Sequence, residues 1–159
     1  MIKIKKILKW LFVVILVVFI AIQFKRPART NPPVDESQTL AAHTQMTPEV
    51  ADILARSCYD CHSNRTTWPW YTNVAPISWF IVDHVNEGRA DLNFSEWGKY
   101  EQRRQDRRLQ QMCDLAQDAS MPLTSYTPLH SGSKLTPAQV KTLCDWTKAE
   151  RERLSASNP

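Results

Sequence analysis

The sequence predicts an all-α domain that follows an N-terminal apolar helix and a proline-rich tether. Glycine is scarce, with three residues in 159, and many prolines stand at or near the start of stretches with helical periodicity. This composition fits helices joined by short turns and fits β architecture poorly. We divide the chain into a signal anchor or transmembrane helix (residues 1–24), a tether (residues 25–46) and the helical domain (residues 47–154).

The anchor is predicted from an apolar run that follows several lysines. Residues Trp10 to Ile22 form an uninterrupted apolar run, Lys9 can snorkel toward the membrane surface, and Ile7, Leu8 and Phe24 extend the run. A cleaved signal peptide is the alternative, but the segment lacks a clean small-x-small cleavage site. Both interpretations export the rest of the chain, so we expect a protein of the bacterial inner membrane whose domain faces the periplasm.

Residues 25–46 are predicted to hold the domain away from the membrane. They contain Pro27, Pro32, Pro33 and many polar residues, with no apolar periodicity. Such a composition is typical of an extended linker. The alternative is that part of the segment wraps around the domain in an ordered conformation.

One pair of the four cysteines has the spacing of a haem-attachment motif. Cys58-Tyr59-Asp60-Cys61-His62 is a Cys-x-x-Cys followed at once by His, the signature of c-type haem. Each thiol adds across one vinyl group of haem, and two intervening residues let a helical turn present both sulfurs to one porphyrin edge. The sequence predicts one covalent haem c, with Cys58 and Cys61 as thioether anchors and His62 as the proximal iron ligand.

Two other sites can be built from the same pair of cysteines. A zinc site would combine Cys58, Cys61 and His62 with a later cysteine, and a thioredoxin-like dithiol would need a strand-helix context that the sequence lacks. Export favours haem, because haem is attached to c-type proteins outside the cytoplasm. The many aromatic residues after the motif also favour haem, since they need a large apolar partner.

Met121 is the preferred ligand for the second axial position of the iron. It precedes Pro122 in a turn-rich stretch, and a proline beside the ligand stiffens the loop that presents it. Small cytochromes c have the same order of attachment motif, methionine loop and closing helix. The alternative for Met121 is a place in the core. The other candidate ligands are Met46, Met112, His43, His84 and His130.

Cys113 and Cys144 are predicted to form a disulfide. Each lies on an apolar stripe with helical spacing, so each is expected to face inward on its own helix. An oxidising compartment favours the bridge, which would tie the helix before the Met121 loop to the helix after it. Two separate buried thiols are the alternative.

Helix signals divide the domain into four predicted helices. Thr47 is a good N-cap with Pro48 at the first helical position, and Gly88 is a C-cap signal that ends the second helix. The predicted helices cover about residues 47–58, 76–88, 95–117 and 136–154.

Charge does not predict a nucleic-acid partner. Lys plus Arg exceed Asp plus Glu by 20 to 16, and part of the excess lies in the N-terminal lysines. Arg65 and Arg89 are candidates to pair with haem propionates. The basic run at residues 103–108 is predicted to be an exposed helix face, with a docking patch for an acidic redox partner as the alternative.

Several motifs together resemble the bacterial haem-binding domain family. They are the attachment motif with Ser63-Asn64, Trp68-Pro69-Trp70-Tyr71, Ala75-Pro76-Ile77-Ser78-Trp79, Asn93-Phe94-Ser95-Glu96-Trp97, and Met121-Pro122 with Tyr126-Thr127-Pro128-Leu129-His130. The resemblance spans residues 45 to 150 and implies a small exported or membrane-anchored protein with one c-type haem site. It implies covalent haem at Cys58 and Cys61 with His62 as ligand, and it supports Met121 as the distal ligand.

Three functions compete. One-electron transfer by a membrane-anchored cytochrome c-like protein, with an unidentified periplasmic or membrane redox partner, is favoured over catalysis because six-coordinate iron has no open site. A haem-based sensor or ligand-binding module, in which Met121 is displaceable, is the alternative. A small peroxidase comes third, since it needs a distal acid-base residue such as His84 or His130.

Overall fold

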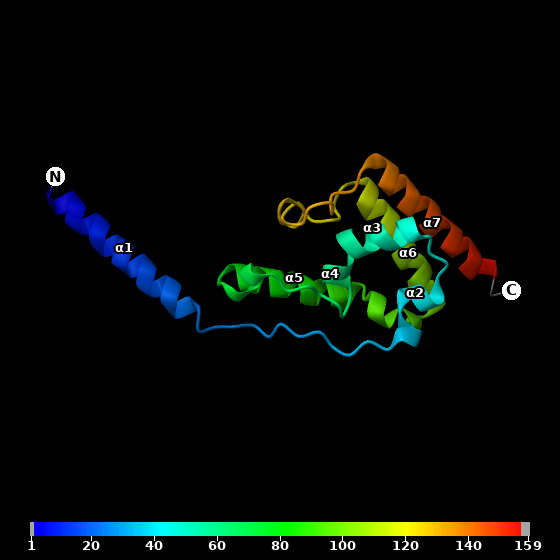
Figure 1. The fold of residues 1–159 in the computed structure, drawn as a ribbon, viewed down its shortest axis with the longest axis horizontal. Helices are drawn as coiled ribbons and strands as arrows, with labels where there is room; N and C mark the ends of the chain where they lie inside the picture. Colours follow the sequence, from blue (N-terminus) through cyan, green and yellow to red (C-terminus); the bar gives the residue numbers. More distant parts are fainter. Residues whose placement is uncertain (1, 157–159) are drawn as a thin grey trace.

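A computed structural model describes residues 2–156 as helices joined by loops, with no strand in this range. Figure 1 shows α1 (Ile2–Ile22) at one end of the molecule, an extended segment after it, and the other helices gathered beyond that segment. The all-α prediction is therefore confirmed. Residue 1 of the predicted anchor lies outside the described residues.

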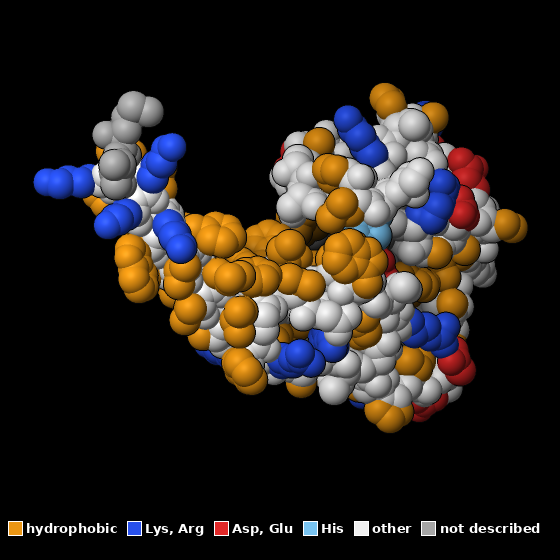
Figure 2. Space-filling view, turned by 60° about the vertical axis from the view of Figure 1, so that its left-hand side comes forward, with side chains coloured by type: hydrophobic (Ala, Val, Ile, Leu, Met, Phe, Trp, Pro, Cys, Tyr) orange, Lys and Arg blue, Asp and Glu red, His pale blue; other side chains and the backbone are white. Residues whose placement is uncertain are grey.

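The prediction of a transmembrane helix at the N-terminus is wrong. Within residues 2–156, no helix combines the length and the apolar character that a membrane crossing requires. The physical reason lies in the first half of α1, which carries Lys3, Lys5, Lys6 and Lys9. The apolar run after these lysines covers roughly 20 Å at 1.5 Å per residue, against a hydrocarbon core about 30 Å thick. Figure 2 shows Lys and Arg side chains at the start of the helix and exposed apolar side chains beyond them.

The segment predicted as a tether packs against the domain over part of its length. It contains η1 (Glu36–Gln38) and α2 (Leu40–His43), and Leu40 is fully buried in the core. Asn31 donates a hydrogen bond from Nδ2 to the Thr66 carbonyl at 2.9 Å. This part of residues 25–46 is thus an ordered wrap, because it supplies both an apolar side chain and polar contacts to the domain.

Two consecutive helices, α3 (Pro48–Ser57) and α4 (Tyr59–His62), carry the cysteine motif. Thr47 caps α3 by accepting a hydrogen bond from the Val50 N–H at 3.2 Å, as the sequence predicts. Val50, Ile53 and Leu54 are buried, and they form the expected inward face. Cys58 ends α3 with a non-helical backbone (φ −130°, ψ −39°), so the chain changes direction inside the motif.

Helix α5 (Ile77–Asp91) continues past Gly88, where the sequence predicts its end. The C-cap is Leu92, whose N–H donates to the Gly88 carbonyl at 2.9 Å. A close approach explains the glycine better, because a Cβ at position 88 would lie 2.6 Å from the Cys61 carbonyl oxygen. The missing side chain lets the attachment turn pack directly on α5.

The long helix predicted from residue 95 is divided in two. η3 (Phe94–Lys99) is a 3-10 helix, and α6 (Gln102–Gln117) begins after Tyr100, whose backbone is extended (φ −82°, ψ 137°). Asn93 caps η3 by accepting a hydrogen bond from the Ser95 N–H at 3.0 Å. The division places Trp97 in the core, 1% exposed, so core packing overrides a continuous helical pattern.

Helix α7 (Pro137–Ala156) closes the domain by packing along α6. Thr136 and Gln139 exchange hydrogen bonds at its start, which makes a reciprocal cap. A disulfide joins Cys113 of α6 to Cys144 of α7. The core that these helices enclose contains Leu40, Val50, Leu54, Leu92, Phe94, Trp97, Leu109, Ala116, Leu143 and Trp146.

Candidate functional site

The attachment motif is a short turn that holds its residues in one place. The N–H groups of Cys61 and His62 both donate to the Cys58 carbonyl, at 3.2 Å and 2.9 Å. Both cysteines are free thiols. One turn of backbone therefore presents two sulfur atoms and an imidazole together, in the order that the sequence predicts.

His62 is oriented by two backbone carbonyls at the C-terminal end of α5. Its Nδ1 lies 3.0 Å from the carbonyl oxygen of Gly88 and 3.0 Å from that of Leu92. A carbonyl oxygen only accepts, so Nδ1 carries the proton and Nε2 keeps its lone pair in the neutral ring. Protein iron and zinc sites commonly orient a ligating histidine in this way. The free nitrogen therefore lies on the ring edge that faces away from these carbonyls.

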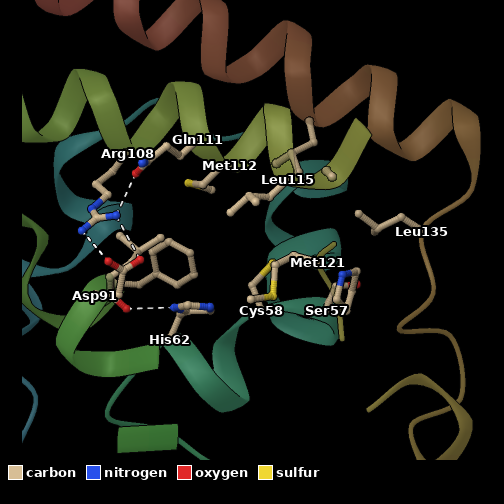
Figure 3. A pocket seen from close by; sticks show the side chains of 15 residues that line it. Ser57, Cys58, His62, Asp91, Arg108, Gln111, Met112, Leu115, Met121 and Leu135 are labelled. Atoms are coloured by element: carbon tan, nitrogen blue, oxygen red, sulfur yellow. Dashed lines mark hydrogen bonds and ion pairs between the residues drawn. The ribbon is translucent and has the colours of Figure 1, made fainter. Parts of the chain in front are cut away.

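A cavity of about 860 Å³, open to solvent, lies beside His62 and is called the α6 cavity here. Figure 3 shows side chains from α6, from the attachment turn and from the loop after α6 around it. Most of the lining is apolar, which is typical of cofactor sites. The lining residues are Ser57, Cys58, His62, Asp91, Leu92, Phe94, Arg108, Gln111, Met112, Leu115, Ala116, Met121, Pro122, Leu135 and Leu143.

A second cavity of about 840 Å³, called the α5 cavity, adjoins the first. The two share Ser57, Cys58, His62, Asp91, Met121 and Pro122 as lining residues. The α5 cavity also reaches Cys61, Gly88 and His84. The structure thus brings all four predicted haem residues, Cys58, Cys61, His62 and Met121, to the walls of adjoining hollows.

The other candidate axial ligands are distributed unequally. Met112 lines the α6 cavity, His84 lines the α5 cavity, and His130 lines a further hollow that Cys61, His84 and Tyr126 also line. His43 lies 3.0 Å from the Ser37 carbonyl, and Met46 packs against the core. These last two residues line neither cavity, so the structure removes them from the set of ligands within reach of His62.

Among the aromatic residues after the motif, Phe94 alone lines the α6 cavity. Its ring lies 6.0 Å from that of His62 and 5.4 Å from that of Tyr59, centroid to centroid. Trp97 is in the core, whereas Trp70 is largely exposed. Of these aromatic residues, Phe94 is therefore the one placed beside the α6 cavity, and Trp97 has an ordinary place in the core.

The two arginines that are candidates to pair with haem propionates, Arg65 and Arg89, have other partners. Arg65 forms an ion pair with Glu36. Arg89 donates to the carbonyls of Ser63 and Thr30, both at 2.8 Å, and so binds the N-terminal wrap to the domain. Neither arginine lines the α5 or the α6 cavity.

Arg108 lines the α6 cavity with its side chain 15% exposed, so the prediction that residues 103–108 form an exposed helix face is wrong for this residue. Its Nη1 and Nη2 donate to the Asp91 carboxylate at 3.0 Å and 2.6 Å, and Nη1 also donates to Gln111 at 2.7 Å. Its Nε is buried without a hydrogen-bond partner among the described residues. A signal existed, because residues 108, 111, 112 and 115 all line the cavity and recur at i, i+3, i+4 and i+7.

Burial acts on both thiols of the attachment motif. Burial raises the pKa of Cys58 to about 12 and that of Cys61 to about 11, so both stay protonated at neutral pH. Within residues 2–156, no group of three or more His, Cys, Asp or Glu side chains is arranged to hold a metal ion.

The residues around these hollows fit a haem group. A haem requires apolar walls, which Leu92, Phe94 and Leu115 provide, and an imidazole nitrogen, which His62 presents. Gly88 adds a cradle in which the attachment turn lies, since a Cβ there would collide with it.

Comparison with known proteins agrees with this fit. The family model described as "Haem-binding domain" matches residues 17–149. No curated protein and no solved structure matches the chain. The match covers most of the sequence, including the attachment motif, the cavity walls and the loop that carries Met121, and it shows that this chain belongs to the haem-binding domain family.

Proposed function

We propose that the protein is a monohaem c-type cytochrome-like carrier of single electrons. Cys58 and Cys61 anchor the haem covalently, His62 is the proximal ligand, and Met121 is the distal ligand. The observation that carries the proposal is the arrangement around His62, whose Nδ1 is tied to α5 while the cavity beside it contains Met121. Bound haem would supply a reversible ferric-ferrous couple, and the chain sets its ligands and its exposure to water.

The positions of the candidate ligands relative to the His62 ring support methionine as the distal ligand. The carbonyls that accept from His62 Nδ1 belong to the end of α5, and His84 lies on that same helix. Nε2 is on the opposite edge of the ring, so a ligand across the iron would come from the other wall. Met112 and Met121 lie there, on α6 and on the loop after it.

Electron transfer is favoured over catalysis by the polar groups of the α6 cavity. Its ionisable groups besides His62 and Cys58 are Asp91 and Arg108, and these two pair with each other. A peroxidase needs an acid-base side chain free to exchange protons above the iron. Asp91 and Arg108 are poor candidates for that task, because each already holds the other.

We place the protein in an oxidising compartment, the bacterial periplasm, with an unidentified redox partner. The disulfide between Cys113 and Cys144 supports this location, since such bridges are rare in the cytosol. Haem attachment to a Cys-x-x-Cys-His motif takes place in the same compartment.

A haem-based sensor is the second candidate, and one observation favours it. Met121 is 36% exposed and lies on a loop, so a small ligand could displace it. Carbon monoxide binding to the reduced protein separates the two functions. Slow binding supports a carrier with a firm Met121 ligand, and fast binding supports the sensor.

The test uses full-length holoprotein produced together with a haem-attachment system. Haem should stay on the wild-type polypeptide in a denaturing gel and should be lost when both Cys58 and Cys61 are replaced by serine. The ferric protein should show the near-infrared charge-transfer band that methionine gives with haem c. Met121→Ala should abolish this band, whereas the matched control Met112→Ala should retain it. The ligand assignment fails if wild type lacks the band or if Met112→Ala alone removes it.

A further inference from the structure

Two hydrogen bonds join the loop that carries Met121 to the haem-attachment turn and to the residue before it. Ser57, which directly precedes Cys58, donates from Oγ to the Ser133 carbonyl at 2.8 Å in a buried contact. Asp60, which stands between the two cysteines, accepts from Tyr126 Oη at 2.8 Å. The two sides of the cavity are thus linked by hydrogen bonds as well as by the chain.

Of these two hydrogen bonds, the one between Tyr126 and Asp60 joins two side chains. Asp60 uses both carboxylate oxygens, because Oδ1 accepts from the Thr67 N–H at 2.9 Å and Oδ2 accepts from Tyr126. Burial, followed by the hydrogen bond to Asp60, raises the pKa of Tyr126. The hydroxyl therefore keeps its proton at neutral pH and remains a donor to a charged acceptor, which is among the stronger kinds of hydrogen bond.

The ring of Tyr126 is held in one orientation by His130. The two rings stack with centroids 3.7 Å apart and an angle of 11° between their planes. His130 Nδ1 donates to the Tyr126 carbonyl at 2.9 Å, which leaves Nε2 to accept from Tyr71 Oη at 3.3 Å. Tyr126 consequently cannot turn its hydroxyl away from Asp60 without breaking this stack.

We propose that Tyr126 is a positioning residue that keeps Met121 at the iron by fastening the ligand loop to the attachment turn. The inference rests on the proposed function, in which Met121 is the distal ligand. On the N-terminal side of Met121 the loop is already held, because the Met121 N–H donates to the Leu115 carbonyl at 3.0 Å and Cys113 is in a disulfide. After Met121, the side chain of Tyr126 is hydrogen-bonded to Asp60 in the attachment turn.

We expect the hydrogen bond of Tyr126 to limit how readily small ligands displace Met121 from the iron. Without the hydroxyl, the loop keeps its anchor at the end of α6 but can swing away on the other side of Met121. The sulfur of Met121 would then leave the iron more often, although His62, Cys58 and Cys61 are unchanged. The expected signature is a change in ligation and in reduction potential with little change in fold.

The test compares Tyr126→Phe with Tyr71→Phe in the holoprotein. Both variants remove one hydroxyl from the same aromatic group, but only the hydroxyl of Tyr126 reaches Asp60. We expect Tyr126→Phe to weaken the near-infrared methionine band, to lower the reduction potential, and to speed carbon monoxide binding about tenfold, the effect of losing one hydrogen bond to a charged group. Tyr71→Phe should change all three measurements less than Tyr126→Phe, because its hydroxyl bonds to His130 and does not reach Asp60.

A second variant approaches the same contact from its other partner. Asp60→Ala removes the 2.8 Å acceptor and leaves the Tyr126 hydroxyl only its longer bond to the Arg56 carbonyl at 3.4 Å. It should therefore change the spectrum and the carbon monoxide rate in the same direction as Tyr126→Phe, including when Tyr126→Phe itself accumulates poorly. Wild-type behaviour of either variant, or equal changes in Tyr71→Phe and Tyr126→Phe, overturns the role of Tyr126 while leaving electron transfer in place. A wild-type protein without the methionine band overturns the ligand assignment itself, and the proposal for Tyr126 with it.

Discussion

Replacing Gly88 with alanine is expected to destabilise the protein, although alanine is the better helix former. In an exposed helix interior the change would add about 1 kcal/mol of stability. Here the new Cβ would lie 2.6 Å from the carbonyl oxygen, 3.2 Å from the carbonyl carbon and 3.3 Å from the Cβ of Cys61. Backbone cannot rotate aside, so the turn would have to move by about 0.8 Å to restore an ordinary contact of about 3.4 Å.

The net effect follows from these opposing contributions. Overpacking of this kind costs about 1–3 kcal/mol, and a weakened hydrogen bond from His62 to the Gly88 carbonyl costs about 0.5–1.5 kcal/mol more. After subtracting the gain of about 1 kcal/mol in helix propensity, we expect a net loss of about 0.5–3.5 kcal/mol. Covalent haem content should also fall, because the shift moves Cys61 and His62 together.

The measurement is urea unfolding of the holoprotein followed by circular dichroism, with haem content determined by absorbance in alkaline pyridine. Asn86→Ala is the matched control, since Asn86 is exposed on the same helix and the substitution improves helix propensity without a clash. It should leave stability and haem content equal to wild type or slightly higher. If Gly88→Ala behaves like Asn86→Ala, the close packing of the turn on α5 is refuted.

Three further perturbations test the fold and the ligand loop. Replacing both Cys113 and Cys144 with serine should cost about 3–4 kcal/mol in the free energy of unfolding, because the bridge closes a loop of 31 residues; reduction of the wild-type protein should give the same loss. Leu109→Ala should cost about 2–5 kcal/mol, since Leu109 is fully buried, whereas Leu129→Ala at an exposed position should change stability by no more than about 0.5 kcal/mol. Burial and the hydrogen bond to Asp60 raise the pKa of Tyr126 above that of an unfolded tyrosine, about 10. This contribution to stability is complete below pH ~10 and is lost as the pH rises through the folded pKa, so wild type should lose more stability than Tyr126→Phe in alkaline solution; parallel profiles would contradict the assignment.

Helix starts and inward faces were predictable because they depend on neighbours within one turn. Thr47 caps α3 through Val50, three residues away, and Thr136 caps α7 through Gln139 in the same manner. The inward stripe of α3 was also predicted correctly. The break at Tyr100 was not, since it arises from the burial of Trp97 within the assembled core.

In the N-terminal part of the chain, the sequence pattern predicted the structure less accurately. Residues 25–46 look like a linker because they are polar and proline-rich, yet Leu40 is buried in the core and Asn31 bonds to the domain. The apolar run of α1 looked long enough when its ends were extended by snorkelling and flanking residues. The lysines within the helix leave it short of the length and apolar character that a membrane crossing requires.

The attachment motif is the feature that the sequence determined by itself. Cys58, Cys61 and His62 lie within one turn of backbone, so their spacing along the chain already sets which groups meet one cofactor. The tertiary structure decided what surrounds them: the α5 carbonyls that orient His62, the Arg108 pair with Asp91, and the contact of Tyr126 with Asp60. These contacts join residues 17 to 66 positions apart, and no local pattern encodes which of many possible partners the packing of helices will bring together.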